Sequence, residues 1–373
     1  MKITLMFVIN SLSVGGAERV FSTLLKNINR NQFDIILAIG ARTDGFLNEV
    51  PKDIKIVELS GSKRAIKSFF PLLRLIRYEK PDIVFSTLGM VSSSSLCSFF
   101  TSKNITYIAR FGNTISADLY RSKRESYFKY LFQKLSYLLV LKRCKIVTQS
   151  EYMKNDLVQY FALSNSDDVH VIYNPCPNPS VLYSNPEQRK SKNLVTVGRF
   201  AWQKGYDILI DSLGMLAKDG WEFKFYFIGG GDKAEEKIVK DKAKKAKLTE
   251  IVEFLGEREQ PFCAVNDIDI FVSSSRFEGF ANVILESLAN GIPVVATDCP
   301  SGNREIIDEK VNGWLTNQVG SEPTARELYE TISTALETVE SFDRYKIKEE
   351  VRKTFAIETV VSHYESLFLE FKK

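Results

Sequence analysis

The chain has 373 residues, which is too long for one ordinary hydrophobic core and fits two domains of roughly 150–200 residues each. Its 44% hydrophobic and 26% charged residues are typical of a globular protein, and a net charge of +4 is too small to indicate nucleic-acid binding by itself. Five cysteines without a C-x-x-C pair and only two histidines, His170 and His363, disfavour a disulfide framework and a zinc site, and they predict a reduced, cytoplasmic protein.

The first half of the chain alternates apolar runs with amphipathic stretches. It opens on the run ITLMFVI, followed by a glycine-rich turn and an amphipathic stretch, which predicts a strand, a loop and a helix. Helices are also predicted over 63–78 and 122–141. Further strands are predicted at 33–40, 54–59, 82–89, 105–111, 144–150 and 169–173. Nearly continuous apolar strands that alternate with helices indicate a parallel sheet covered on both faces.

A proline-rich stretch divides the chain. Residues 174–193 hold four prolines and several Asn and Ser, so they are predicted to form a linker, after which the strand and helix pattern starts again. The strands of this second half are predicted at 194–200, 223–231, 252–256, 268–275 and 293–297 and near Trp314, with helices from 204, over 232–247, from about 281 and through 321–373. We therefore expect an α/β protein with two doubly wound, Rossmann-like domains. Ligands of such sheets bind at the carboxyl ends of the strands, so two facing domains would hold a site in the cleft between them.

Two cations follow the first strand of the second half. In VGRFAWQKG, Arg199 comes directly after the strand, and Lys204 lies five residues later at the predicted start of a helix. A guanidinium with fixed, paired donors and a compact ammonium together suit an anion. Two solvated cations in a loop also fit these residues, so this alternative stays open at this point.

Two glycine-rich loops also follow strands. The stretch IGGGDK places Gly230 between two other glycines, and SVGGAER places Gly15 beside Gly16 after the first strand. Glycines without a Cβ let the backbone approach a ligand closely, and a following helix start offers N–H groups. Plain turns explain both loops equally well. The adjacent glycines of SVGGAER do not make the G-x-G-x-x-G fingerprint of dinucleotide-binding proteins.

The stretch RFEGFANVILE carries two glutamates. Glu278 is predicted in a loop after a strand, and Glu286 lies about one turn inside a helix that begins near Asn282 and Val283. A helix start attracts phosphate, a carboxylate one turn inside can accept two hydroxyls of a ribose, and a carboxylate in the loop can bind the hydroxyls of a sugar. Two solvated glutamates are the alternative that these residues leave open.

Together these motifs resemble those of the retaining glycosyltransferases of family 4, which have the GT-B fold, and the E-x7-E element is the most specific part. The resemblance divides the chain into an acceptor-binding domain, 1–178, with a crossing helix of about 357–373, and a nucleotide-sugar-binding domain, 190–356. The matching segments, in chain order, are GGAER, VIYNPC, VGRFAWQKGYDILIDS, FYFIGGGD, VEFLG, SSSRFEGFANVILESLANGIPVVATDCPSGNREII and NGWL.

The resemblance implies a role for each motif. Arg199 and Lys204 would hold the diphosphate of a nucleotide-sugar donor, while Glu286 would bind the ribose and Glu278 the sugar. Further donor contacts are implied for Phe280, Ala281, Asn282 and Val283, for Gly230, and for the loop of Gly15 and Gly16. The family uses no metal or other cofactor, because Arg, Lys and a helix start can neutralise the leaving diphosphate. Its retaining reaction is attributed to front-face attack, so we assign no protein nucleophile.

The chain departs from the family at one place. Many members carry a histidine after the strand that here reads YIARFGNTIS, and the matching position in this chain is about Phe111. The neighbouring Arg110 and Asn113 become the candidates for a contact with the acceptor or the donor sugar. His170 and His363 lie elsewhere in the sequence and are interpreted as structural residues.

Two basic and aromatic segments point to the acceptor. Residues 121–145 hold eight Lys or Arg and one acid, a net charge of 8 − 1 = +7, with apolar and aromatic residues interleaved, and residues 63–77 have a similar character. Such segments suit the surface of an anionic membrane, although helices that pack on the sheet and expose a basic face would look alike. With the resemblance, they predict a peripheral protein on the inner face of the plasma membrane that extends a polyprenyl-diphosphate-linked glycan.

The predicted reaction is the transfer of a hexose or N-acetylhexosamine from a nucleotide sugar, expected to be a UDP-sugar, to a glycan of surface-polysaccharide biosynthesis. A sugar-nucleotide epimerase of the same fold and a non-catalytic nucleotide-sugar-binding module are the alternatives. A nicotinamide-dependent oxidoreductase is disfavoured by the missing fingerprint. No nucleic-acid partner is expected.

Overall fold

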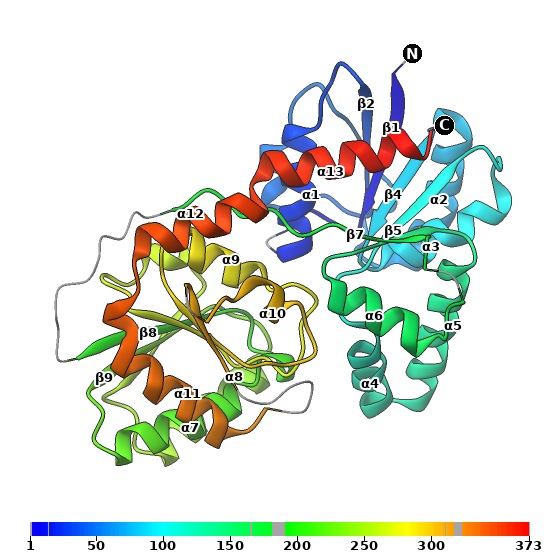
Figure 1. The fold of residues 1–373 in the computed structure, drawn as a ribbon. Helices are drawn as coiled ribbons and strands as arrows, with labels where there is room; N and C mark the ends of the chain where they lie inside the picture. The colour runs from blue at the N-terminus through cyan, green and yellow to red at the C-terminus, as the bar shows by residue number, and fades with distance from the viewer. Residues whose placement is uncertain are drawn as a thin grey trace. The chain divides into compact units, whose positions relative to one another are not determined.

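The computed structural model describes residues 2–13, 15–164, 166–180, 191–309, 311–316 and 323–372 (Figure 1). The chain divides into two compact units, one formed by Met1–Pro175 with Ile357–Lys373 and the other by Cys176–Ala356. Each unit is built on its own parallel sheet, so each is described by itself.

The first unit contains a seven-stranded parallel sheet in the order β3-β2-β1-β4-β5-β6-β7. Its strands are β1 Ile3–Ile9, β2 Phe33–Ile39, β3 Lys55–Glu58, β4 Ile83–Thr87, β5 Thr106–Arg110, β6 Lys145–Thr148 and β7 Val169–Val171. Its helices are α1 Gly16–Asn27, α2 Ala65–Glu79, α3 Met90–Cys97, α4 Ile115–Glu125, α5 Tyr127–Leu141, α6 Glu151–Tyr160 and α13 Ile357–Glu370, with the 3-10 turns η1 Phe46–Glu49 and η2 Ser98–Phe100. The strand order reverses between β1 and β4, as in a doubly wound sheet.

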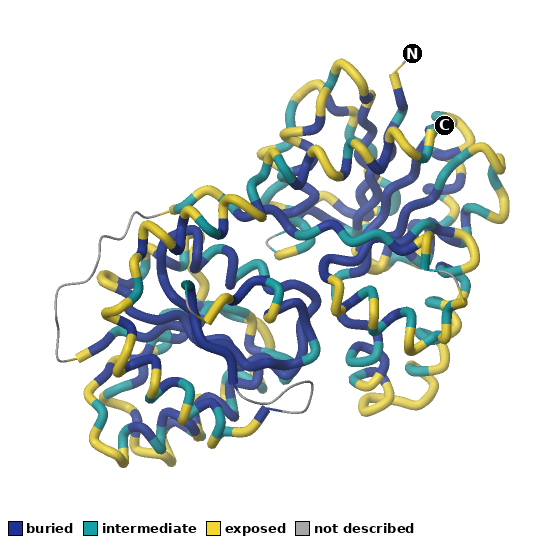
Figure 2. The backbone as a smooth tube through the Cα atoms, viewed as in Figure 1, coloured by how far each residue is buried: buried dark blue, intermediate teal, exposed yellow. Residues whose placement is uncertain are grey.

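Helices cover both faces of this sheet. The strand β1 is apolar throughout because its side chains are buried on both faces. Successive side chains of a strand point to opposite faces. Phe7 therefore joins the core cluster that includes Phe21 of α1 and Phe368 of α13, while Met6 joins the cluster that includes Leu72 of α2. Figure 2 shows the strands buried between helices whose outer faces are exposed. The last helix, α13, is thus part of the core of the first unit.

The second unit contains a six-stranded parallel sheet in the order β10-β9-β8-β11-β12-β13, again doubly wound. Its strands are β8 Lys192–Val197, β9 Phe223–Ile228, β10 Val252–Gly256, β11 Ile270–Ser273, β12 Val294–Ala296 and β13 Gly313–Leu315. Its helices are α7 Tyr206–Lys218, α8 Lys233–Lys245, α9 Asn282–Ala289, α10 Asn303–Ile306, α11 Ala325–Thr338 and α12 Arg344–Phe355, with the 3-10 turns η3 Trp202–Lys204, η4 Pro261–Cys263 and η5 Val339–Ser341. The predicted fold class, two doubly wound α/β domains, is confirmed.

Two predicted elements differ from the structure. The single helix expected over 122–141 is broken at Ser126, where the backbone is extended (φ −167°, ψ 135°). The break lets α4 and α5 pack side by side around a buried carboxylate, because Asp118 of α4 accepts hydrogen bonds from Gln133 (2.9 Å) and Tyr137 (3.0 Å) of α5. The linker expected over 174–193 is too long at its end, since β8 already begins at Lys192; residues 181–190 lie outside the described part of the chain.

Candidate functional site

The candidate site lies at the point where the strand order of the second sheet reverses. The strands β9, β8 and β11 are neighbours in this parallel sheet, so the loops that follow them all begin at the carboxyl ends of the strands, on the same side of the sheet. These loops carry Arg199, Lys204, Gly230 and Glu278. Each of these residues follows a strand, as predicted, and the structure adds that the three strands are neighbours. Ligands of doubly wound sheets bind in this position.

Lys204 and Glu278 form an ion pair across two of these loops. The Lys204 Nζ atom lies 2.7 Å from Oε1 of Glu278, and the two side chains are only 20% and 10% exposed. Ser275 Oγ donates to the same carboxylate oxygen at 2.7 Å, and Gln203 Nε2 lies 3.3 Å from the other. A buried carboxylate with three partners is not a solvated surface charge, so the alternative of a freely solvated Glu278 is excluded.

A glycine allows the two loops to approach each other. Gly205 follows Lys204 with φ +63°, a left-handed conformation that suits glycine, and a Cβ at this position would lie 2.1 Å from the carbonyl oxygen of Ser274. Ser274 also donates its hydroxyl to the carbonyl oxygen of Lys204 at 2.8 Å. Gly205 therefore fixes how closely the Lys204 loop lies against the Glu278 loop.

Arg199 projects from a backbone that is held to the next loop. Phe200 N donates to Gly230 O at 2.6 Å, and Asp232 N donates to Phe200 O at 3.0 Å. The Arg199 side chain is exposed and makes no ion pair with any described residue. A Cβ on Gly230 would lie 2.3 Å from a carboxylate oxygen of Glu257, an exposed side chain that would have to move aside. The guanidinium of Arg199 is therefore exposed to solvent at the carboxyl end of β8.

The start of α9 adds backbone donors at the same edge. Ala281 is its N-cap residue, and its methyl side chain makes no capping hydrogen bond to the first turn, which begins at Asn282 and Val283. Phe280, which is buried against Phe355 of α12 at 5.6 Å between ring centroids, holds this helix start in place. Glu286 lies one turn inside α9, as predicted, and the structure shows that it is half-buried.

The glycine pair predicted for the N-terminal loop lies in the first unit. Gly16 begins α1 and Gly15 is its N-cap residue. A Cβ on Gly15 would lie 2.4 Å from a carboxylate oxygen of Glu18 in the first turn, so that flexible side chain would have to move aside. The predicted donor contact of Gly15 and Gly16 remains a prediction.

The two residues predicted to flank the missing histidine differ in exposure. Arg110 is 1% exposed, and its guanidinium donates to Asn174 (2.6 Å) and Tyr364 (3.2 Å), with Thr87 at 3.5 Å. Asn113 is half-buried in the loop after β5. Because Arg110 is enclosed by neutral partners of its own unit, Asn113 is the one of the two with surface available to a ligand.

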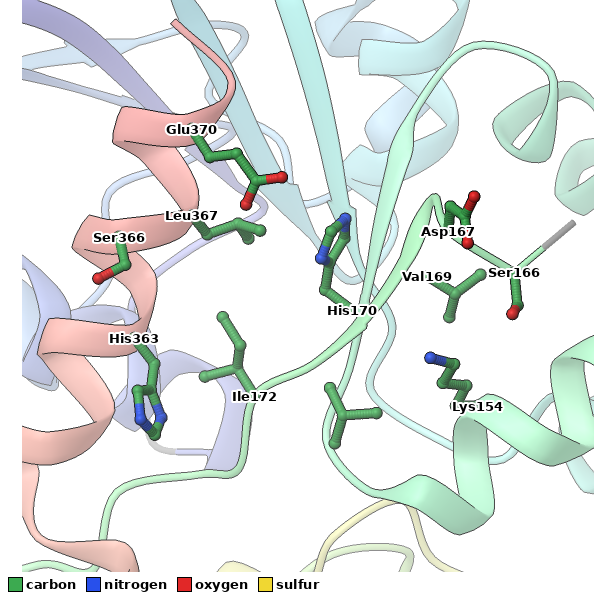
Figure 3. A pocket seen from close by; sticks show the side chains of 11 residues that line it. Lys154, Ser166, Asp167, Val169, His170, Ile172, His363, Ser366, Leu367 and Glu370 are labelled. Atoms are coloured by element: carbon green, nitrogen blue, oxygen red, sulfur yellow. The ribbon is translucent and has the colours of Figure 1, made fainter. Parts of the chain in front are cut away.

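A cavity of about 410 Å³ lies elsewhere in the first unit, among α6, β7 and α13 (Figure 3). His170 on β7 and His363 on α13 both line it, together with Lys154 and Glu370. Burial lowers the pKa of His170, which packs edge-on against Phe371 at 5.2 Å between ring centroids. None of the residues predicted to bind the donor lines this cavity.

Four residues around the Lys204–Glu278 pair were not predicted from the sequence: Asp207, Gln203, Ser275 and Arg276. Two of them, Ser275 and Arg276, lie in SSSRFEG directly before Glu278. The arginine in this stretch could have been predicted to form an ion pair. A basic residue in a loop between a buried strand and a buried helix has to find a partner, because an unpaired buried charge is costly.

Two family models together match most of the chain. Residues 14–177 match the model described as Glycosyltransferase Family 4, and residues 191–337 match the model described as Glycosyl transferases group 1. The two matches fall one in each half of the chain, and the second covers all the loops of the candidate site.

Two curated relatives cover nearly the whole chain. One is the N-acetylgalactosamine-N,N'-diacetylbacillosaminyl-diphospho-undecaprenol 4-alpha-N-acetylgalactosaminyltransferase of Campylobacter jejuni, 30% identical over 92% of this chain and 93% of the relative. The other is the amylovoran biosynthesis glycosyltransferase AmsD of Erwinia amylovora, 25% identical over 92% of this chain and 89% of the relative.

Solved structures share the fold over the full length. Anabaena HepE in complex with UDP-glucose matches with a TM-score of 0.77 at 18% identity, over 98% of this chain and 99% of HepE. The lipopolysaccharide outer core galactosyltransferase WaaB matches with a TM-score of 0.75 at 18% identity, over 99% of this chain and all of WaaB. At this identity the likeness concerns the fold.

Proposed function

Because the chain belongs to glycosyltransferase family 4, we propose that it transfers a hexose or N-acetylhexosamine from a UDP-sugar to a glycan acceptor and retains the configuration at the anomeric carbon. The observation that carries the proposal is the Lys204–Glu278 pair at the edge of the second sheet, beside Arg199 and the start of α9. It joins in one place a cation for a diphosphate and a carboxylate for sugar hydroxyls.

In the proposed site the positive groups hold the leaving diphosphate. Arg199 and Lys204 supply two full charges, and the N–H groups at the start of α9 supply partial ones. These charges stabilise the diphosphate as its negative charge grows, which is the task that a divalent cation performs in other enzymes. We therefore propose that the reaction needs no metal or other cofactor.

The two glutamates divide the rest of the donor between them. Glu286, one turn inside α9, would accept the ribose hydroxyls, and Glu278 would accept hydroxyls of the sugar that is moved. The bond between the anomeric carbon and the diphosphate oxygen breaks while a bond to the acceptor oxygen forms on the same face. The acceptor proton passes to the leaving phosphate oxygen, so neither glutamate acts as a nucleophile.

The choice of a UDP-sugar is supported by HepE, whose structure holds UDP-glucose in the same fold. A thermal-shift panel of UDP-, GDP- and ADP-sugars tests it, because a ligand that binds the folded state stabilises it by about 2.7 kcal/mol at one hundred times its dissociation constant. We expect stabilisation by at least one UDP-sugar and none by NAD. Stabilisation by NAD alone, or an epimerised sugar released without any acceptor, would contradict the proposal. NMR of the product's anomeric proton then reads the configuration.

We further propose that the acceptor is linked to a lipid and that the protein binds the membrane surface. The Campylobacter relative is named for an undecaprenol-linked acceptor, which supports a lipid carrier. No helix in the described part of the chain has the length and apolar character needed to span a bilayer. We propose that contact with the membrane comes from a surface of the first unit.

The outer face of α5 provides such a surface. Tyr137 and Val140 turn inward and join the core, whereas five large apolar side chains on the opposite face are exposed. These are Phe128, Leu131, Phe132, Leu135 and Leu138, with 83% of Phe128 and 74% of Phe132 exposed. The spacing of 3 and 4 residues places them on one side of the helix. An unpartnered apolar stripe of this size marks an interaction site.

The surroundings of this stripe favour an anionic lipid surface over a protein partner. Exposed basic residues are Lys129 on α5, Lys142 and Arg143 directly after it, and Lys123 and Arg124 at the end of the neighbouring α4. The helix α2 adds exposed Ile66 and Phe70. The two predicted segments meet through α3, which packs against both α2 and α5. Apolar and aromatic side chains flanked by Lys and Arg are the composition that binds anionic headgroups.

We expect Phe128→Ser/Phe132→Ser to lower partition onto phosphatidylglycerol vesicles at least about tenfold, because burying one such side chain contributes about 1.5–3 kcal/mol. Sedimentation with the vesicles measures it. The matched control, Ile238→Ser/Tyr345→Ser, removes two exposed apolar side chains of the second unit and should leave partition onto the vesicles unchanged. Equal partition of both variants, or a change in oligomeric state without a change in partition, would refute the surface.

A further inference from the structure

We propose that Arg276 and Asp207 are positioning residues, whose ion pair holds the loop of Lys204 against the loop of Glu278 and acts on sugar transfer through these two side chains. The inference rests on the roles proposed above for Lys204 and Glu278. It concerns two residues that do not touch the donor in that proposal.

The pair has the geometry of a strong, directional contact. Arg276 Nη1 lies 2.8 Å from Oδ1 of Asp207, and Nη2 lies 2.7 Å from Oδ2, so two hydrogen bonds run in parallel. Burial, the largest single influence on the pKa of Asp207, acts to raise it, but the opposing influences, led by the hydrogen bond and charge of Arg276, leave the pKa below its usual value. Asp207 therefore stays ionised and paired at neutral pH.

Arg276 contacts residues on both sides of Lys204 in the turn that carries this lysine. Besides Asp207, Nη1 donates to the carbonyl oxygen of Trp202 at 2.8 Å, and the guanidinium lies 4.9 Å from the centre of the Trp202 ring. The backbone N–H of Arg276 donates to Gln203 O at 2.7 Å. Lys204 lies in sequence between these contact points. One side chain thus fixes both ends of the segment that presents the lysine.

The same turn reaches the glutamate. Gln203 Nε2 donates to the carbonyl oxygen of Phe277 at 2.9 Å and lies 3.3 Å from Oε2 of Glu278. Arg276 is two residues before Glu278, so a shift of its side chain moves both members of the Lys204–Glu278 pair. Misplacement of a reacting or binding group by about 1 Å can cost on the order of a hundredfold in rate.

A second ion pair of the same unit serves as a control, because it can distinguish an effect on the position of Lys204 and Glu278 from a general effect on stability. Arg276 and Asp207 are 8% and 39% exposed, and Lys192 and Glu340 form a pair with nearly the same exposure, 9% and 38%. Lys192 is the first residue of β8, at the opposite end of that strand from the site loops. Removing the charge of Asp207 or of Glu340 should therefore lower stability to a similar degree, while only Asp207 should affect turnover.

The experiment compares Asp207→Asn with Glu340→Gln by release of UDP from the UDP-sugar that stabilises the protein most in the panel. Both are assayed well below their midpoints of thermal unfolding. We expect Asp207→Asn to lower kcat at saturating donor about tenfold and Glu340→Gln to leave it within twofold. Arg276→Lys, which keeps the charge but cannot make two parallel bonds, should lower kcat as well and serves if Asp207→Asn does not fold.

The decisive readout is coupling. In a Lys204→Ala background, Asp207→Asn should cause almost no further loss, because residues that act as a unit are non-additive. An equal loss in both backgrounds, or equal kcat values for Asp207→Asn and Glu340→Gln, would overturn the inference. Wild-type kcat in Lys204→Ala itself would instead show that the proposed site is wrong, and the positioning role would fail with it.

Discussion

Replacing Lys204 with alanine is expected to lower kcat about a hundredfold or more and to destabilise the fold at the same time. The rate falls because the leaving diphosphate loses a full positive charge; removing one preorganised donor from such a site typically costs 10²–10³ in kcat. Stability falls by about 1–3 kcal/mol because the buried carboxylate of Glu278 loses its cation. Steady-state kinetics and denaturant unfolding measure the two effects separately.

A second substitution tells these effects apart. Adding Glu278→Gln to Lys204→Ala removes the unpaired carboxylate, so we expect stability to recover while activity stays low. Lys242→Ala is the matched control, since Lys242 also pairs with a carboxylate of the same unit, Asp211 at 2.6 Å, but on the outer helices α7 and α8. Unchanged kcat in Lys204→Ala, or loss of activity in Lys242→Ala, would contradict the assignment.

Arg199→Ala is expected to lower kcat ten- to a hundredfold without a measurable loss of stability. Arg199 is exposed and makes no ion pair among the described residues, so its removal leaves no buried group without a partner. The loss of rate corresponds to about 1–3 kcal/mol, the scale of a hydrogen bond to a charged group. Arg326→Ala, an exposed arginine on α11, is the control and should leave kcat unchanged.

Glu286→Ala should give the opposite kinetic pattern and therefore serves as the comparison for Arg199→Ala. A carboxylate that binds the ribose interacts equally with the substrate and the transition state, so its removal weakens donor binding and leaves kcat at saturation nearly unchanged. Calorimetric titration with the UDP-sugar measures the dissociation constant. A fall in kcat for Glu286→Ala with no change in donor binding would reverse the proposed division of roles.

Much of the second unit's site could be predicted because strand ends are visible in the sequence. Continuous apolar runs marked β8, β9 and β11, and residues directly after such runs in a doubly wound protein come to one edge of the sheet. The rule predicted that Arg199, Lys204 and Glu278 follow strands, but it left solvated charges as an alternative, and their roles came from the family resemblance. The position after a strand is predictable because it depends on the local sequence.

The contacts between the loops could not be predicted in this way. Lys204 and Glu278 were assigned to different parts of the donor, and the structure pairs them at 2.7 Å; Arg276 and Asp207 had no assigned role at all. These pairs join residues about 70 positions apart. Apolar periodicity predicts the strands and helices, but it does not predict which side chains of two different loops contact each other.

The class of fold, two doubly wound sheets with their loops in order, can be predicted from the sequence because the apolar periodicity of each strand and helix is a local property. Which apolar faces are covered depends on the packing of segments that lie far apart in the chain. The sequence of α5 is apolar nearly all round, which alone is typical of a buried helix. The break at Ser126 and the packing of α4 leave Phe128 and Phe132 outside the core, because burial depends on neighbours that are distant in the chain.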